Sequence, residues 1–244
     1  MAGVGICILG MHRSGTSCLA GSLQNAGLQL GEVVENAPHN LKGNRENLQV
    51  RNLNDAVLST SGGAWDRPPR SLRWTQEQAA RRDALVELYE ALPGRYWGFK
   101  DPRTVLTLPF WRERMPDVRL VTTYRHPLAV AQSLAAREQM PFDQGLRLWQ
   151  AYNETLLSYL NRYGGPLVSF DVSRDEYLVA VDAVMSLLGL AGQGAAIDQR
   201  LAFFDETLRH QSSTELALSR VMPHETENVY TQLQHYYEKL SLRS

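Results

Sequence analysis

The residues whose types suit chemistry gather first in one short loop near the start of the chain. This loop, between an apolar stretch at 4–9 and a helical stretch at 18–26, consists of Gly10-Met11-His12-Arg13-Ser14-Gly15-Thr16-Ser17. In a strand–loop–helix unit, successive backbone N–H groups and the positive end of the helix form an anion pocket of phosphate size. The loop therefore predicts an anion site, in preference to a glycine-bearing turn that holds no ligand.

A second group of anion-binding residues follows a predicted strand at 119–124. Arg125 comes directly after that strand, and Pro127 is well placed in the first turn of a helix that we expect to reach residue 137. Ser133 lies on this helix about two turns from its start, near enough to share an anion with Arg125. A guanidinium presents a planar fork that suits a phosphate group. The alternative is an arginine that only caps carbonyl groups of the sheet.

Two parts of an ordinary nucleoside triphosphatase are missing from these motifs. The glycine spacing of the first loop matches a nucleotide-binding loop, but Thr16 replaces the lysine that reaches the β- and γ-phosphates. The strand at 119–124 ends in Arg125, where such enzymes carry an acid that helps to hold magnesium. The sequence thus predicts a phosphate cradle without the accompanying parts of a kinase.

Together the two motifs resemble those of the sulfotransferases, which take a sulfuryl group from 3′-phosphoadenosine 5′-phosphosulfate (PAPS). The resemblance implies that Arg13-Ser14-Gly15-Thr16-Ser17 binds the 5′-phosphosulfate of PAPS, and that Arg125 and Ser133 bind its 3′-phosphate. It covers residues 6–24 and 99–134, and the remaining chain only by length and strand order. The expected product is adenosine 3′,5′-bisphosphate, and no metal is implied.

Basic residues at the strand ends are expected to stabilise the charge on the leaving phosphate. Lys100-Asp101-Pro102, after a predicted strand at 96–100, is similar to a segment of several sulfotransferase branches. We expect Lys100 and Arg13 to stabilise the charge that shifts to the leaving phosphate during transfer. The alternative for Lys100 is a surface lysine, and Asp101 is expected to orient a neighbour or cap a helix.

A base for the acceptor proton is expected on the acceptor side of the site. The segment 36–47 resembles a stretch of related bacterial and carbohydrate sulfotransferases, although Asn44-Arg45 stands where two aromatic residues are common. This makes Glu46 the first candidate for the base and His39 the second. The alternatives are a glutamate that favours the dipole of the next helix and a solvated loop histidine.

The elements that must position these residues alternate along the chain. Strand patterns at 4–9, 96–100, 119–124 and 166–170 are separated by helical patterns, among them 46–58, 127–137 and 174–190. This predicts an α/β fold, specifically a P-loop-like three-layer domain with a central, mostly parallel sheet and helices on both faces. Ligands bind such sheets at the carboxyl ends of the strands, where Arg13, Lys100 and Arg125 stand.

Several individual residues are expected to cap helices or to lie in loops. Thr75 with Gln78 forms a capping box, and Asp143 is expected to cap a long amphipathic helix that ends at Gly164. Asp171, after the fourth strand, is expected either to close the site or to cap the following helix. Trp65 lies in a glycine-rich loop, where packing is expected in preference to a sugar platform.

Length and composition set the remaining limits. The chain has 244 residues, which predicts a single domain over 1–244, and its formal net charge of −1 provides no global positive field for a nucleic acid. No apolar run approaches the roughly 20 residues of a transmembrane segment. The two cysteines, Cys7 and Cys18, are too few for a disulfide framework and suit a reducing compartment, so we expect a cytoplasmic protein.

These observations predict a PAPS-dependent sulfotransferase that acts on an acceptor hydroxyl, of a carbohydrate, a lipid headgroup or a small metabolite. Its partners are then the nucleotide donor and a hydroxyl-bearing acceptor. One alternative is a P-loop small-molecule kinase that uses ATP with magnesium. Another is a non-catalytic nucleotide-binding module, which would bind adenosine 3′,5′-bisphosphate without turning anything over.

Overall fold

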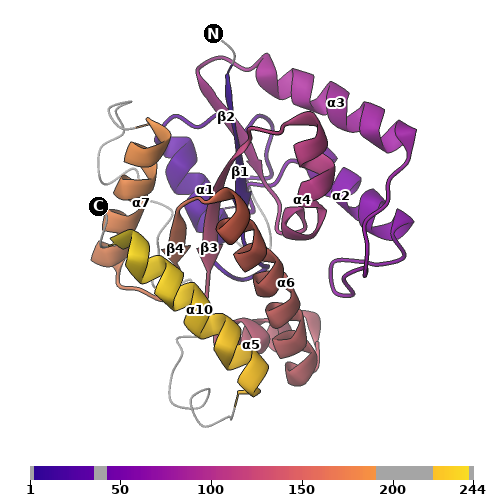
Figure 1. Ribbon diagram of the computed structural model, residues 1–244. Helices are drawn as coiled ribbons and strands as arrows, with labels where there is room; N and C mark the ends of the chain where they lie inside the picture. The colour runs from indigo at the N-terminus through magenta and orange to yellow at the C-terminus, as the bar shows by residue number, and fades with distance from the viewer. Residues whose placement is uncertain (1–2, 36–42, 191–221, 242–244) are drawn as a thin grey trace.

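A four-stranded parallel sheet forms the centre of the computed structural model, which describes residues 3–35, 43–190 and 222–241. The strands lie in the order β2-β1-β3-β4 and all pair in parallel. Their bounds are β1 Val4–Leu9, β2 Tyr96–Lys100, β3 Arg119–Tyr124 and β4 Leu167–Ser169. They run down the view in Figure 1, so their carboxyl ends meet toward α5. The parallel sheet predicted from the sequence is confirmed.

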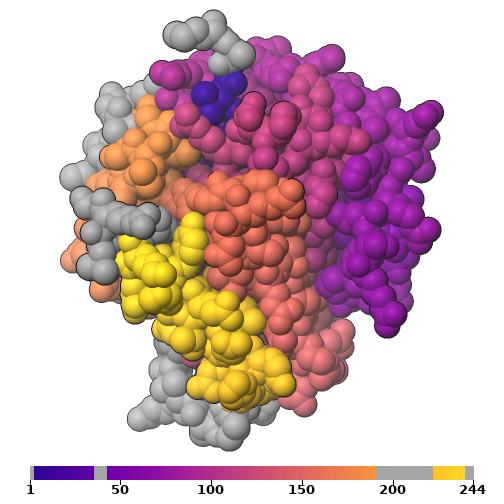
Figure 2. All heavy atoms as spheres, in the orientation of Figure 1, coloured from indigo at the N-terminus to yellow at the C-terminus, as the bar shows by residue number. Residues whose placement is uncertain are grey.

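Helices cover both faces of this sheet. Their bounds are α1 Thr16–Asn25, α2 Leu48–Thr60, α3 Gln76–Glu90, α4 Thr104–Arg114, α5 Pro127–Glu138, α6 Phe142–Tyr163, α7 Arg174–Leu188 and α10 His224–Ser241. Helices α1 and α7 lie on one side, and α3, α4, α6 and α10 lie on the other (Figure 1). Helix α10 runs along α6 at the surface shown in Figure 2. The structure therefore has the three layers that the strand and helix order predicts.

The alternation of side chains along each strand explains the layers. In β1, Ile6 and Ile8 pack into the core beneath α1 and α7, while Cys7 and Leu9 pack into the core on the opposite face. All four side chains are completely buried. A strand that is covered on both faces is apolar at every position, which is why residues 4–9 form an unbroken apolar run.

Two helix starts differ from the sequence prediction. Helix α2 begins at Leu48, because the Asn47 side chain accepts hydrogen bonds from the backbone N–H groups of Gln49 and Val50. Glu46 therefore precedes the helix. The expectation that Asp143 caps α6 was wrong: the cap position is Pro141, and Asp143 lies in the first turn, where its charge suits the helix dipole. The Thr75–Gln78 capping box is confirmed.

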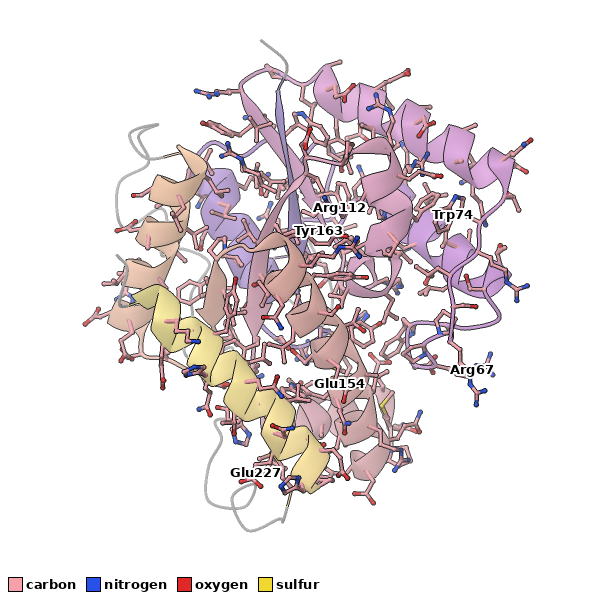
Figure 3. All side chains as sticks on the ribbon, in the orientation of Figure 1. Arg67, Trp74, Arg112, Glu154, Tyr163 and Glu227 are labelled. Carbon is pink, nitrogen blue, oxygen red and sulfur yellow. The ribbon has the colours of Figure 1, made fainter. Side chains whose placement is uncertain are left out.

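A cation–π contact joins two helices on the face that carries α6. The guanidinium carbon of Arg112 lies 3.8 Å from the ring centre of Tyr163, so the end of α4 is held against the end of α6 (Figure 3). Cys7 and Cys18 are both buried and form no disulfide with each other. Among the helices that the structure describes, none is long and apolar enough to cross a membrane.

Candidate active site

Glycine is required at two positions of the loop between β1 and α1. A Cβ atom on Gly10 would lie 2.6 Å from the carbonyl oxygen of Thr123 in β3. Gly15 has a φ of 83°, in the left-handed region, and a Cβ atom there would lie 2.2 Å from the ring of Phe170. The loop is thus pressed against the carboxyl ends of β3 and β4, which brings residues from three strands to one place.

The loop backbone is held in a conformation that is uncommon for side chains other than glycine. Arg13 has a φ of 67°. The Thr123 hydroxyl donates a hydrogen bond of 3.0 Å to the Ser14 carbonyl, while the completely buried Ser14 hydroxyl has no hydrogen-bond partner within the described part of the chain. Leaving a buried polar group unsatisfied costs about 1–3 kcal/mol. Such an orphaned group at an anion loop fits a ligand that completes its hydrogen bonds.

The two sequence motifs meet through the side chain of Arg13. Its Nε donates a hydrogen bond of 2.7 Å to the hydroxyl of Ser133 on α5. Arg125 also reaches this loop, because one of its terminal nitrogens donates to the Arg13 carbonyl at 3.4 Å. Burial, followed by the charges of Arg137 and Arg125, lowers the pKa of Arg13. Arg13 and Arg125 therefore bring positive charge together beside the loop, and a bound anion would reduce the repulsion between them.

Asp171 holds Arg125 from the end of β4. One carboxylate oxygen of Asp171 lies 3.4 Å from Arg125 Nε, and the other accepts a hydrogen bond from the backbone N–H of His126. The Trp149 indole donates to the Arg125 carbonyl at 2.9 Å. Arg125 is 6% exposed, and partners fix both its backbone, through the buried Trp149, and its guanidinium, through the partly exposed Asp171. Of the two roles expected for Asp171, its contacts support the one at the site.

A second group of site residues forms around Lys100 at the end of β2. Lys100 Nζ lies 2.8 Å from Glu46 Oε1 and 3.3 Å from the hydroxyl of Ser17. Lys100 is only 1% exposed, which excludes the surface lysine considered as an alternative. The Ser17 hydroxyl in turn donates to the Asn44 carbonyl at 3.1 Å. The start of α1 thus contacts the lysine and, through it, the first candidate base.

The position of Glu46 is set by the backbone on either side of it. Its carbonyl accepts a hydrogen bond from the N–H of Val34 at 3.0 Å, and the N–H of Arg45 donates to the Val34 carbonyl at 3.1 Å. The Asn47 side chain also donates to the Glu32 carbonyl at 2.9 Å. Glu46 is therefore placed by pairing of the 30s and 40s segments, and it is not part of the first turn of α2.

Asp101 organises the turn after Lys100. It accepts a hydrogen bond of 2.7 Å from the backbone N–H of Arg103 and forms an ion pair of 3.2 Å with the Arg103 guanidinium. Burial raises the pKa of Asp101 to about 6, even though Arg103 opposes this shift. Arg103 also pairs with Asp55 on α2 at 2.6 Å. Asp101 thus has the orienting role that its place before α4 predicts.

His12 lies in an aromatic corner beside the anion loop. Its ring centre is 4.6 Å from that of Trp65 and 6.1 Å from that of Tyr152. The Tyr152 hydroxyl donates to the Trp65 carbonyl at 2.8 Å, which fixes the loop that carries Trp65. Burial, followed by the charges of Arg103 and Lys100, lowers the pKa of His12 well below its usual range. The imidazole is therefore neutral at pH 7.

Sequence reasoning missed or left open several of these positions. His39 falls at 36–42, outside the described residues. The partnership of Asp101 with Arg103, the Asn47 cap and the contact between His12 and Trp65 were not predicted, although the position of His12 within the anion loop was a usable signal.

Across the described ranges, no group of three or more His, Cys, Asp or Glu side chains is placed to hold a metal ion.

The arrangement can do two things chemically. Arg13, Ser133 and Arg125 can bind an anion between β3 and the first loop, and Lys100 can neutralise a second negative charge near the start of α1. Glu46 supplies a carboxylate beside that lysine, which suits proton removal from a hydroxyl. A bound molecule with anionic groups at two ends would meet both sets of residues.

Comparison with known proteins agrees with this geometry. A family model described as "Sulfotransferase family" matches residues 5–180 of the chain. A search of curated proteins finds no match. Two solved structures are similar over nearly the whole chain, at sequence identities that show the fold alone.

The first is a sulfotransferase domain from the curacin biosynthetic pathway. It is 16% identical, with a TM-score of 0.57, and the match covers 96% of this chain and 98% of that one. The second is a sulfotransferase domain from an olefin synthase of Synechococcus PCC 7002. It is 15% identical, with a TM-score of 0.56, and the match covers 96% of this chain and 95% of that one.

Proposed function

Because this chain belongs to the sulfotransferase family, we propose that it transfers a sulfuryl group from PAPS to the hydroxyl of a carbohydrate or a small metabolite. The proposal is supported by the hydrogen bond from Arg13 Nε to the Ser133 hydroxyl. This contact joins the loop expected at the 5′-phosphosulfate with the helix expected at the 3′-phosphate. A donor that carries anionic groups at both ends suits such a joined pair of sites.

The two sets of anion-binding residues fit this donor. Arg125 and Ser133 would hold the 3′-phosphate, with Asp171 fixing the Arg125 guanidinium. The loop Arg13 to Ser17 would hold the 5′-phosphosulfate through its backbone N–H groups and hydroxyls, including the buried Ser14 hydroxyl. When bound, PAPS supplies an activated sulfuryl group, and its phosphate is the leaving group.

The residues around Lys100 would carry out the proton and charge steps. The Glu46 side chain lies 2.8 Å from Lys100 Nζ, where it would accept the proton of an acceptor hydroxyl. Lys100 and Arg13 would stabilise negative charge on the leaving phosphate. His39 remains the second candidate for the base, since the structure does not describe it.

Calorimetric binding of nucleotides tests the proposal without knowledge of the acceptor. Adenosine 3′,5′-bisphosphate, ADP and ATP would each be titrated with and without magnesium. We expect tight, magnesium-independent binding of the bisphosphate. Magnesium-dependent preference for ATP would favour the kinase alternative. Bisphosphate binding without sulfate transfer to any member of a hydroxyl acceptor panel would favour the binding module.

A further inference from the structure

The Nε2 atom of His12 is a buried polar atom in the anion loop, and it has no role in the proposed chemistry. It has no hydrogen-bond partner among the residues that the structure describes. The two rings beside it, Trp65 and Tyr152, give the imidazole packing but no hydrogen bond to this nitrogen. Because a buried N–H or ring nitrogen without a partner is costly, its retention in an anion loop indicates that a ligand atom completes it.

The charges around His12 limit what that ligand atom can be. Lys100, Arg103, Arg13 and Arg137 all act electrostatically on the imidazole. These cations oppose protonation of the ring, so His12 is poorly suited to remove a proton from an acceptor. They attract an anion to the same place. A neutral imidazole can still donate one N–H hydrogen bond to an anionic oxygen without acquiring a charge.

We infer that His12 Nε2–H donates a hydrogen bond to an oxygen of the sulfuryl group of the bound donor. The inference rests on the proposed function, because it takes PAPS as the ligand. The 3′-phosphate already has Arg125 and Ser133 as its expected donors. His12 adjoins Arg13 in the loop and lies within the field of Lys100, so its free donor fits the sulfuryl end. No bond is made or broken by His12.

The test compares two nucleotides that differ only in the sulfuryl group. PAPS and adenosine 3′,5′-bisphosphate would be titrated calorimetrically, without acceptor, into the wild type, His12→Phe and His12→Gln. Phenylalanine keeps a ring against Trp65 but has no N–H. Glutamine carries an amide N–H near the position of Nε2. Thermal unfolding of each variant serves as the folding control.

We expect His12→Phe to lose roughly ten- to a hundredfold in affinity for PAPS, the range for a hydrogen bond to a charged group. Its affinity for the bisphosphate should match that of the wild type, and His12→Gln should recover most of the loss. If His12→Phe does not fold, His12→Asn replaces it, because its shorter amide stops near the Nδ1 position.

Three results would overturn the inference. Unchanged affinity of His12→Phe for both nucleotides would mean that no bond to the sulfuryl group exists. An equal loss for both would mean that His12 only shapes the loop. Binding of neither nucleotide to the wild type would reject the proposed function, and the inference with it, and this outcome is distinct from the other two.

Discussion

Lys100 Nζ lies 2.8 Å from Glu46 Oε1, and the pair is almost closed to solvent, with the lysine side chain 1% exposed and the glutamate 13% exposed. The two residues are far apart in the sequence, one at the end of β2 and the other before α2. Removal of one partner from an ion pair this buried leaves the other without compensation. The pair therefore couples the candidate base to the residue expected to stabilise the leaving phosphate.

Replacing the candidate base by its amide tests this coupling. Glu46→Gln should bind adenosine 3′,5′-bisphosphate as the wild type does but show no PAPS-dependent sulfate transfer across a panel of hydroxyl acceptors. The amide oxygen still accepts a hydrogen bond from Lys100, so we expect the unfolding free energy to fall by only about 1–3 kcal/mol. Retained turnover would pass the role of base to His39 or to a water molecule.

The 3′-phosphate site is tested by truncation of Arg125. Arg125→Ala should weaken binding of adenosine 3′,5′-bisphosphate by roughly 1.5–3 kcal/mol, since it removes a charge-assisted hydrogen bond. Affinity for adenosine 5′-phosphate should change little. Arg81→Ala, at an exposed position of α3, is the matched control for loss of one positive charge. An equal loss for both nucleotides would contradict a specific role at the 3′-phosphate.

Asp171 is expected to act on the donor only through Arg125. Asp171→Asn should weaken binding of the bisphosphate less than Arg125→Ala does, because the amide still accepts a hydrogen bond from the His126 N–H but no longer pairs with the guanidinium. In the double variant the two effects should be non-additive by about 0.5 kcal/mol or more. Strict additivity in these titrations would show that Asp171 does not position Arg125.

The close approach of Phe170 to Gly15 predicts a loss of stability that a second glycine can calibrate. Gly62→Ala introduces a side chain at a φ of 76° with nothing within 4 Å, so its cost of about 1–2 kcal/mol measures backbone strain alone. Gly15→Ala has similar strain and also clashes with the Phe170 ring, and should cost more. Chemical denaturation of both variants gives the comparison; equal costs would mean that the ring moves freely aside.

Asp101 predicts a pH dependence of stability with a definite sign. Its pKa is raised to about 6 in the folded protein, above the value of the unfolded chain. The folded state therefore binds the proton more tightly, and this contribution to stability is present at low pH and is lost as the pH rises through about 6. Denaturation of the wild type and Asp101→Asn at pH 5 and pH 7 should show the wild type gaining relative stability at pH 5. The opposite trend would contradict the raised pKa.

Local patterns in the chain were sufficient to predict the elements and their order. The apolar run at 4–9, the capping box at Thr75 and the Pro127 helix start depend on neighbouring residues, so each was identified without a partner from elsewhere. Strand and helix alternation then predicted the parallel sheet. The same patterns placed Arg13, Lys100 and Arg125 at the carboxyl ends of strands.

Only the tertiary structure shows which of those residues contact one another. Arg13 and Ser133 are 120 positions apart, and Lys100 and Glu46 are 54 apart, so no local periodicity relates them. Helix α2 started later than its apolar pattern suggested, because an Asn47 cap competes successfully with helical continuation. Burial also decided the charge state of His12, since desolvation depends on Trp65 and Tyr152 from distant segments. Residue types and local spacing thus determine which groups reach the sheet edge, and long-range packing decides which of them touch.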